Sequence, residues 1–518
     1  MGETTLSRWV PVPLAAAAAA LACLAFASHA WQALSGAYLS HVSGIWLALG
    51  SDLSAGVFYR EIAGPMGYGG TRYFPLFFTI IGGLLRVGVP PLAAGATASA
   101  IAAAVLATGL ARVVSAIGAP RRLVWLAAAG ALAPYFIQQT LFEVRADVLA
   151  AGLNLWGLSA AIPLWRTPSG ARPRVWTAVA WFTLALSAKV TSLAVPGCVA
   201  VALVLSGQAR TAFRFSAGMA LGALGFLGVV EAASAGRAIP SWRACMFAGT
   251  SEGQMFLRLF DGDFIVLARY SHLLTALLGL TCLALAGAVA LRWRDRMREP
   301  SSMAHPAAGG TSLWLPVVLF AGVSASTALT LSSPGTVPSN QMVEWLGISF
   351  AVLAWAACAR RELRGIVSIV LAAVVIWMSA QDFVRVSQLW QMRSSRTSLA
   401  VRQQVVDLVA KAASPVLSES ALWPVLAGQQ PFVLDPFALR VMMISRPDIA
   451  RDFESKVEAR FFSSVILQVD PTSVRGRGYY EHVHFGWPMT TRILANYRFH
   501  SHPAEDVWIY LPKAPNEH

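Results

Sequence analysis

Long apolar runs alternate with short polar loops along most of the chain, and this pattern stops near residue 384. A helix needs about 20 apolar residues to cross the hydrocarbon core of a bilayer. Runs that meet or approach this length predict eleven spans, at residues 10–34, 91–111, 123–142, 147–165, 175–188, 190–206, 213–233, 264–290, 312–331, 341–358 and 365–383. We therefore expect an α-helical polytopic membrane protein.

The stretch between the first two spans, residues 35–90, is too polar to cross a bilayer and too apolar for a plain loop. Apolar residues recur at helical spacing around Asp52. This predicts an amphipathic helix that rests among lipid headgroups. A carboxylate that is simply solvated at the membrane surface would fit the same pattern. A second apolar piece, residues 73–89, is expected to lie along the interface as well.

Composition supports a membrane protein. Of the 518 residues, 56% are hydrophobic and 13% are charged, and the mean hydropathy is +0.57. The net charge is +14, but the basic residues are spread over short loops. Such a distribution favours membrane topogenesis and contact with anionic lipid, and we expect no nucleic acid partner.

The basic residues also predict the orientation. With residues 73–89 at the interface, the loops on one side of the membrane carry about twice as many basic residues as those on the other. By the positive-inside rule the richer side is cytoplasmic. The N-terminus is then inside, and the C-terminal part is outside. Asp52, the turn from Glu143 to Asp147, Lys189 and the loop 234–263 all fall on the outer face.

Asp147 and Lys189 are the most unusual of these outer residues. Asp147 opens an apolar helix, where a carboxylate either serves a site or caps the helix N-terminus. Lys189 separates two short apolar runs, so it either faces an anion at depth or extends to the membrane surface. Glu143 lies one helical turn before Asp147 and either shares its role or is solvated. Asn154 is interpreted as an interhelical hydrogen-bonding residue.

The C-terminal segment, residues 384–518, has a different pattern. Strand-like runs at 416–418, 431–435, 465–470, 497–500 and 507–511 alternate with helical stretches at 394–412 and 446–460. This predicts a small α/β domain. Glu419, Asp435 and Asp470 each end a strand-like run; they either form a second site or make strand-end turns. His482 and His484 form a weak metal-binding pattern.

Cysteine spacing predicts neither a disulfide framework nor a metal site. Four of the five cysteines fall in predicted spans, and Cys245 lies in the loop 234–263. Small apolar packing residues are the expected role. The loop itself either covers the site as a lid or simply connects two spans.

Four motifs occur in an order that resembles one family. They are Asp52 after the first helix, Tyr73-Phe74-Pro75-Leu76 at the next juxtamembrane helix, Arg145-Ala146-Asp147 at the start of a later helix, and Ala188-Lys189-Val190-Thr191. This layout resembles the GT-C superfamily of polytopic glycosyltransferases, in particular the branch of protein O-mannosyltransferases and aminoarabinose transferases. The resemblance covers residues 10–210.

The resemblance implies a fold and an activity. The fold is a transmembrane GT-C-like module, residues 1–383, with juxtamembrane helices in the first outer loop, 35–90, and an outer domain at 384–518. The activity is inverting transfer of a sugar from a polyprenyl-phosphate donor to a hydroxyl of a glycan, glycolipid or protein. The reaction would take place on the outer face of the cytoplasmic (inner) membrane.

The resemblance also implies site residues. Asp52 is the expected base, and Asp147 orients the acceptor or, with Asp52, helps to hold a divalent metal cation. Arg72, Arg145 and Lys189 are expected to bind the donor phosphate. Supporting residues are expected at Tyr59, Arg60, Tyr73 and Glu143. The sequence shows no full ligand set for a metal ion.

Two other classes of function share part of this pattern. A lipid-linked-sugar flippase or transporter would also have many spans with charges in them, but such proteins typically carry internal repeats and paired broken helices. A non-catalytic envelope assembly protein could have the same outer domain. It would not need Asp52, Asp147 and Lys189 on one face.

Overall fold

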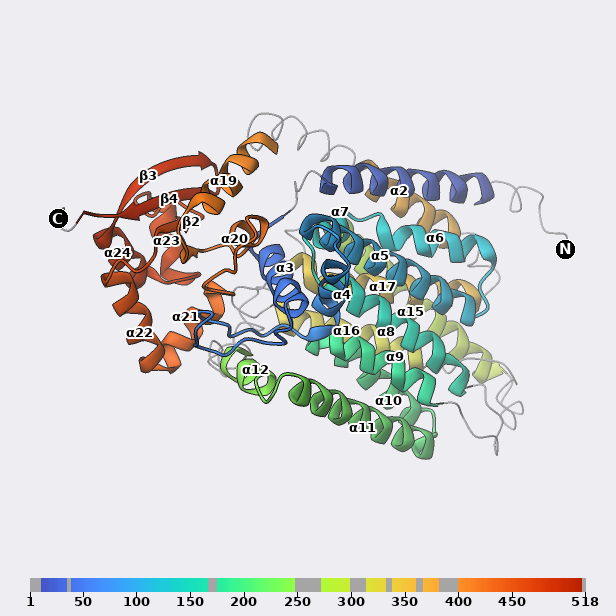
Figure 1. Cartoon of the computed structure of the whole chain (residues 1–518). Coiled ribbons are helices and arrows are strands. Elements are labelled where there is room, and N and C mark those ends of the chain that lie inside the picture. Colours follow the sequence, from blue (N-terminus) through green and yellow to red (C-terminus); the bar gives the residue numbers. More distant parts are fainter. Residues whose placement is uncertain are drawn as a thin grey trace.

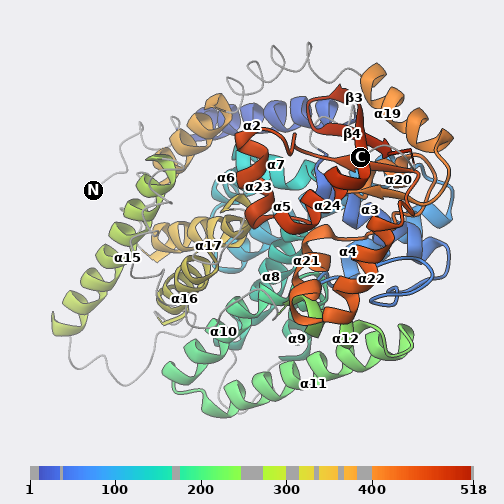
Figure 2. The same cartoon turned by 90° about the vertical axis from the view of Figure 1, so that its left-hand side faces the viewer.

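The computed structural model describes residues 11–34, 39–165, 175–246, 272–298, 314–331, 338–359, 367–381 and 399–514. It has a helical body and a smaller C-terminal part beside it (Figures 1 and 2). The predicted boundary at 383/384 lies outside the described residues. The same holds for residues 247–263 of the loop proposed as a lid, and for the start of the predicted span 264–290.

The helices of the body follow the predicted apolar runs. They are α2 (Pro11–Leu34), α3 (His41–Ser54), α4 (Pro75–Arg86), α5 (Pro91–Ala116), α6 (Arg121–Leu132), α7 (Tyr135–Phe142), α8 (Asp147–Ala161), α9 (Val175–Ala188), α10 (Ala194–Leu205), α11 (Ala209–Ala233), α12 (Ala238–Met246), α15 (His272–Arg298), α16 (Trp314–Leu331), α17 (Pro338–Ala359) and a helix at Val367–Gln381. Short 3-10 helices, η1 (Ile162–Trp165) and η2 (Val190–Leu193), continue α8 and precede α10.

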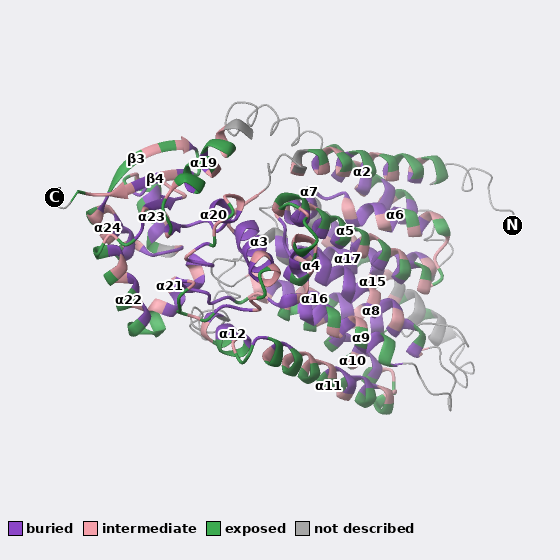
Figure 3. Cartoon of the chain, viewed as in Figure 1, coloured by how far each residue is buried: buried purple, intermediate pink, exposed green. Residues whose placement is uncertain are grey.

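Several of these helices cross the membrane. Within the described residues, five are long and apolar enough to do so: Val12–Trp31, Pro91–Ala116, Asp147–Trp165, Ala209–Ala233 and Trp314–Leu331. Large apolar side chains on the outer faces of α2 and α11, among them Trp31, Phe213 and Val229, are exposed, as expected for lipid contact (Figure 3). The protein is therefore a multi-pass membrane protein, and the total of eleven spans stays a prediction.

One predicted span is interrupted. Residues 123–142 form two helices rather than one, because α6 ends at Leu132 and α7 starts after Pro134. A proline has no backbone N–H to bond the preceding turn, and its ring clashes with that turn, so it favours such a break. The side-chain amide of Gln138 donates to the carbonyl of Leu132 at 2.9 Å and satisfies one of the free backbone groups.

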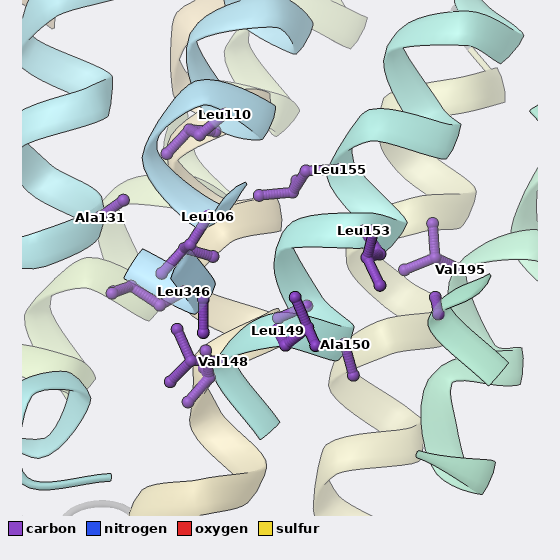
Figure 4. Packing of buried hydrophobic residues seen from close by; sticks show 14 of the residues in the cluster. Leu106, Leu110, Ala131, Val148, Leu149, Ala150, Leu153, Leu155, Val195 and Leu346 are labelled. Atoms are coloured by element: carbon purple, nitrogen blue, oxygen red, sulfur yellow. The ribbon is translucent and has the colours of Figure 1, made fainter. Parts of the chain in front are cut away.

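The core of the body surrounds α8, whose residues are almost all buried. Figure 4 shows Val148, Leu149 and Leu153 of α8 with Leu106 of α5 and Leu346 of α17 in one apolar cluster. Gly152 allows α5 to approach closely, since a Cβ atom there would lie 2.6 Å from the backbone nitrogen of Leu106. This packing fixes the helix that begins with Asp147.

Helix α3 does not rest among lipid headgroups, and that prediction is wrong. Every residue from Val42 to Gly50 is buried. The helix packs against α4 and, at Gly44, against the C-terminal part, where a Cβ atom would lie 2.2 Å from the backbone nitrogen of Leu422. An apolar pattern cannot tell burial in lipid from burial in protein.

The C-terminal part is built on a four-stranded sheet in the order β1-β2-β4-β3. The strands are β1 (Val416–Ser418), β2 (Ser464–Leu467), β3 (Tyr497–Ala504) and β4 (Val507–Pro512). β1 and β2 pair in parallel with Leu417 opposite Val465, and the other pairs are antiparallel. The helices are α19 (Leu399–Lys411), α20 (Leu422–Leu426), α21 (Pro436–Ser445), α22 (Pro447–Glu458), α23 (Val474–His482) and α24 (Trp487–Asn496).

The predicted α/β class of this part is confirmed, but one predicted strand is wrong. Apolar side chains of α19 pack on one face of the sheet, and those of α22 and α24 pack on the other. Residues 431–435 form only an isolated bridge, between Tyr68 and Val433. The chain then enters α21, where Pro436 takes the first turn and the Asp435 carboxylate accepts from the backbone N–H groups of Phe437 and Ala438.

Candidate active site

Asp147 and Lys189 form an ion pair at the start of α8. α9 ends at Ala188, and Lys189 has an extended backbone before η2 starts. From this break the Lys189 Nζ atom reaches the Asp147 carboxylate at 2.6 Å, and the two side chains are 23% and 14% exposed. The predicted interruption at Lys189 is confirmed. The N-cap residue of α8 is Ala146 rather than Asp147, and the Asp147 carboxylate accepts from Lys189.

A polar pocket surrounds this ion pair, with a cavity volume of about 20 Å³. That is space for about one water molecule. Residues from α8, η2, α16 and α17, together with Lys189, line it: Asp147, Ala150, Ala151, Lys189, Thr191, Ser192, Ser326, Thr327, Thr330, Asn340 and Glu344. Nearly all are polar, in a helical body that is otherwise apolar.

Glu344 on α17 is the second carboxylate of the polar pocket, and the sequence analysis did not single it out. Asn154 on α8 donates from Nδ2 to the Glu344 carboxylate and, at 2.9 Å, to the carbonyl of Ser192. The predicted interhelical role of Asn154 is thereby confirmed. An acidic residue near the start of the apolar run 342–358 was the signal available in the sequence.

Arg145 pairs with Glu143 across a strained turn. The Arg145 Nε atom lies 2.6 Å from the Glu143 carboxylate, and both side chains are nearly buried. Val144 between them has φ of +55°, a conformation that costs a branched residue roughly 1–3 kcal/mol. The Ser43 hydroxyl of α3 donates to the carbonyl of Glu143 and joins the turn to that helix.

A basic cluster of His41, Arg72, Arg145 and His484 lies where this turn meets the segment between α2 and α5 and the C-terminal part. Burial lowers the pKa of His41 well below its usual value, and the charges of His484, Arg145 and Arg72 add to the effect. His41 and His484 are in edge contact, with ring centroids 4.7 Å apart. Arg72 is exposed and stacks over the ring of Phe437 at 4.8 Å. The structure thus brings Arg72 and Arg145 into one electrostatic cluster.

Tyr73, whose ring centroid lies 6.0 Å from the Arg72 guanidinium carbon, is hydrogen-bonded to Tyr59. The Tyr59 hydroxyl donates to the carbonyl of Tyr73 at 2.8 Å, and the Trp242 indole on α12 donates to the same carbonyl at 3.2 Å. Burial raises the pKa of both tyrosines. The Tyr73 ring also lies 4.6 Å from the ring of Trp46 on α3. These contacts hold the backbone that presents Arg72.

Asp52 has a partner outside that basic cluster, Arg60. Asp52 lies in the last turn of α3, nine residues after Ser43, which corresponds to roughly 13 Å along the helix. Arg60 binds it with two hydrogen bonds, of 2.5 and 2.7 Å, and both side chains are almost fully buried. Arg60 also donates to the carbonyl of Pro431 at 2.6 Å. Burial raises the pKa of Asp52, although Arg60 opposes this shift.

The three acidic residues that end strand-like runs in the C-terminal part have separate partners. Glu419 is fully buried and accepts from Tyr480 at 2.8 Å, from the backbone of Gln468, and from His484. Asp435 caps α21, and Asp470 accepts from the backbone of Thr472. His484 therefore has a carboxylate partner and lies against His41, a role that the sequence analysis missed.

The carboxylates of the site do not fit a metal ion. Asp52 is bonded to Arg60 and Asp147 to Lys189. Among the described residues, no group of three His, Cys, Asp or Glu side chains could hold a metal ion. The five cysteines carry no disulfide, and Cys245 lies in α12 rather than in a loop.

No protein family model and no curated protein matches the sequence. Solved structures do match. ArnT from Cupriavidus metallidurans bound to undecaprenyl phosphate is 13% identical, with a TM-score of 0.53 over 95% of this chain and 98% of that one. The apo state of that ArnT gives 0.51 over 90% and 92%. An Archaeoglobus fulgidus oligosaccharyltransferase complex with zinc and sulfate gives 0.49, with 13% identity, over 91% of this chain and 69% of that one.

Proposed function

We propose that the protein is a membrane glycosyltransferase. Its fold is that of the GT-C glycosyltransferases, as the ArnT structures show. Within this fold the proposed reaction moves a sugar from a polyprenyl-phosphate donor to a hydroxyl of a glycan, glycolipid or protein, with inversion. One ArnT structure contains undecaprenyl phosphate, which supports a donor of this class.

The observation that carries the proposal is the turn from Glu143 to Asp147. Arg145 on this turn contributes to the basic cluster, whereas Asp147, two residues later, lines the polar pocket. The Cα atoms of two such residues are at most about 7 Å apart. A cationic residue for a phosphate and a carboxylate residue for a hydroxyl are therefore neighbours on one turn of backbone.

Arg72 and Arg145 would bind the donor phosphate. Arg72 is exposed, and its guanidinium can form two parallel hydrogen bonds to a phosphate. As the bond from the sugar to the phosphate breaks, negative charge develops on the leaving oxygen. Fixed cations at that position stabilise the transition state. Lys189 is assigned to Asp147 instead, because their ion pair is only 2.6 Å long.

Asp147 would act as the base. The acceptor oxygen forms a bond to the anomeric carbon, and the bond from that carbon to the phosphate oxygen breaks, with its electron pair leaving on the phosphate. The acceptor proton passes to the Asp147 carboxylate. Lys189 holds this carboxylate in place at the polar pocket.

Asp52, the base expected from the sequence, is proposed to have a positioning role. Its carboxylate is sealed from solvent by Arg60, and Arg60 in turn holds Pro431 of the C-terminal part. We propose that this pair fixes the C-terminal part, residues 384–518, against the transmembrane module, residues 1–383. We propose that transfer takes place on the outer face of the cytoplasmic membrane, the side that the basic loops predict for the C-terminal part.

The test is donor consumption by the purified full-length protein in liposomes, with a panel of undecaprenyl-phosphate monosaccharides. The wild type is expected to consume at least one of them. Asp147→Asn should lower kcat roughly 10²–10⁴-fold, the usual contribution of a general base, at an unchanged Tm. Asp407→Asn, an exposed carboxylate on α19, is the matched control and should retain full activity.

The variant Asp52→Asn tests whether Asp52 is the catalytic base or a positioning residue. It breaks a buried ion pair, which costs on the order of 3–5 kcal/mol, so Tm should fall together with activity. Full stability with abolished transfer would instead return the role of base to Asp52. A wild type that consumes no donor of the panel would refute the proposed function.

A further inference from the structure

A buried hydrogen-bond network in the C-terminal part ends at the basic cluster. Glu419, directly after β1, accepts from the Tyr480 hydroxyl at 2.8 Å, from the backbone N–H of Gln468 at 2.5 Å, and from Nδ1 of His484. The side chains of Glu419 and His484 are 0% and 1% exposed. Since a carboxylate only accepts, Nδ1 is the nitrogen of His484 that carries a proton. The network therefore fixes the orientation of the His484 ring.

The backbone of His484 has an uncommon conformation. Its φ is +50°, in the left-handed region that residues other than glycine rarely adopt. Such conformations persist only where the surrounding contacts impose them, and they cluster at active sites and ligand-binding segments. The ring of Tyr479 packs edge-on against the His484 imidazole, and its hydroxyl lies 2.9 Å from Nδ1. These contacts hold the His484 ring against α3.

His41, the first residue of α3, is the residue that the His484 ring contacts. The ring centroids are 4.7 Å apart, with an angle of 68° between the ring planes. His41 is only half-buried, and its imidazole makes no hydrogen bond within the part of the chain that the structure describes. Burial lowers the pKa of His41 well below its usual value, so near neutral pH the ring is uncharged and retains one N–H. This N–H is a fixed donor that lacks an acceptor among the described residues.

The groups around His41 favour an anion as that acceptor. The Ser43 hydroxyl joins α3 to the carbonyl of Glu143, on the turn that carries Arg145. Arg72 is exposed and makes no ion pair with a described carboxylate. The charges of Arg145 and Arg72 both act on His41, and the partial positive charge of a helix N-terminus adds to them. A phosphate oxygen, which only accepts hydrogen bonds, fits this position.

We propose that His41 is a further ligand of the donor phosphate, and that the Glu419–His484 pair is the positioning unit that fixes the His41 ring. This inference rests on the proposed transferase function, which assigns the phosphate to the basic cluster. The imidazole N–H of His41 donates to a phosphate oxygen, and Arg72 supplies positive charge. Glu419 and His484 act through His41, so the C-terminal part contributes to donor binding without touching the donor.

The test is binding of undecaprenyl phosphate to the purified full-length protein in lipid nanodiscs, with undecaprenol as the reference ligand that lacks a phosphate. His41→Phe keeps an aromatic ring against His484 but removes the N–H. Its Kd for undecaprenyl phosphate should rise about 10–100-fold, the usual loss for a hydrogen bond to a charged group. Binding of undecaprenol should stay unchanged. His500→Phe makes the same change at an exposed position of β3 and should bind both ligands as the wild type does.

A double-mutant cycle tests whether His484 acts through His41. Asparagine tolerates a positive φ, and its amide can still donate to Glu419, so His484→Asn removes the ring contact and keeps the hydrogen bond. Alone, this variant should raise the Kd for undecaprenyl phosphate about 3-fold or more. In the His41→Phe background it should add nothing, because its effect is exerted through His41. A merely structural His484 would instead give the same loss in both backgrounds.

A measurement on the wild-type protein covers the case of a variant that fails to fold. With isotope-labelled histidine, the imidazole resonance of His41 can be identified by its absence in His41→Asn. This resonance should shift when undecaprenyl phosphate is added and should not shift with undecaprenol. Thermal unfolding of each variant reports whether it is folded.

Three results would overturn the inference. They are an unchanged Kd in folded His41→Phe, a His41 resonance that undecaprenyl phosphate does not shift, and equal effects of His484→Asn in the two backgrounds. Failure of the proposed function looks different. A wild type that binds undecaprenyl phosphate but consumes no sugar donor would refute the transferase activity and leave His41 as a phosphate ligand.

Discussion

At the scale of residues, pairing decides which charged side chains can act. Asp52 has two hydrogen bonds to a buried arginine, whereas Asp147 keeps a partly exposed carboxylate beside one lysine. Arg145 is balanced by Glu143, and Arg72 stacks on an aromatic ring. Arg72, which is exposed whereas Arg145 is buried, is the better candidate for first contact with a phosphate.

His41 predicts a pH dependence of stability. Its pKa in the folded protein is lowered below the usual 6.5 by burial and by His484, Arg145 and Arg72. Between the lowered value and 6.5 the unfolded chain binds more protons than the folded one, so stability must fall as pH falls through this window. Thermal unfolding from about pH 7.5 to about pH 5.5 should therefore show a decreasing Tm.

The control for this prediction is a second histidine. His41→Asn should flatten the dependence of Tm on pH, whereas His500→Asn, at an exposed position of β3, should leave it as in the wild type. Equal slopes for the wild type and His41→Asn would show that His41 does not contribute.

At the scale of elements, α3 is the connection between the helical body and the C-terminal part. Its first turn holds Glu143 through Ser43 and packs against α20 at Gly44, and Asp52 of its last turn holds Arg60, which bonds Pro431. Since α3 contacts both the helical body and the C-terminal part, a small shift of this helix would move the basic cluster and the Asp52–Arg60 ion pair together.

The close contact at Gly44 can be tested with one methyl group. In Gly44→Ala the Cβ atom would meet backbone atoms of Leu422 and Ala421, and overpacking of this kind typically costs about 1–3 kcal/mol. Tm should fall. Gly83→Ala on α4 adds the same methyl group in open space, where alanine favours the helix by up to about 1 kcal/mol, so its Tm should rise or stay constant. A Gly44→Ala protein as stable as Gly83→Ala would show that α3 and α20 are not in close contact.

At the scale of the whole molecule, the proposed function needs a particular orientation. The basic cluster includes His484 of the C-terminal part. The proposed function therefore needs the donor phosphate on the side of the membrane that this part occupies. The distribution of basic loops predicts that this side is the outer one. The multi-pass helical body by itself is compatible with either orientation.

Reporter fusions test this orientation. Alkaline phosphatase fused after Pro512 should be active and a fluorescent protein at the same site dark, because the C-terminus is predicted to be outside. A fusion after Ser206, just before Arg210 and Arg214 at the start of α11, should give the reverse pattern. A fluorescent fusion after Pro512 would refute the predicted topology.

The candidate site was predicted in part. Asp147 at a helix start and Lys189 at a helix break could be found from the sequence, because both interrupt a local apolar pattern. That they bond each other needed the packing of α8 against α9. Glu344, His41 and His484 were missed because each gains its meaning from residues far away in the chain.

The sequence by itself determined the membrane class, the positions of the helices and the α/β character of the C-terminal part. These follow from local periodicity and from the length of apolar runs, which act within a few turns of chain. Only the tertiary structure decided which apolar faces meet protein instead of lipid, and which charges are paired. α3 is buried because α4 and α20 pack on it, and Asp52 is bonded because Arg60 folds back onto it. Burial and charge pairing depend on contacts between distant segments, and such contacts exist only in the folded chain.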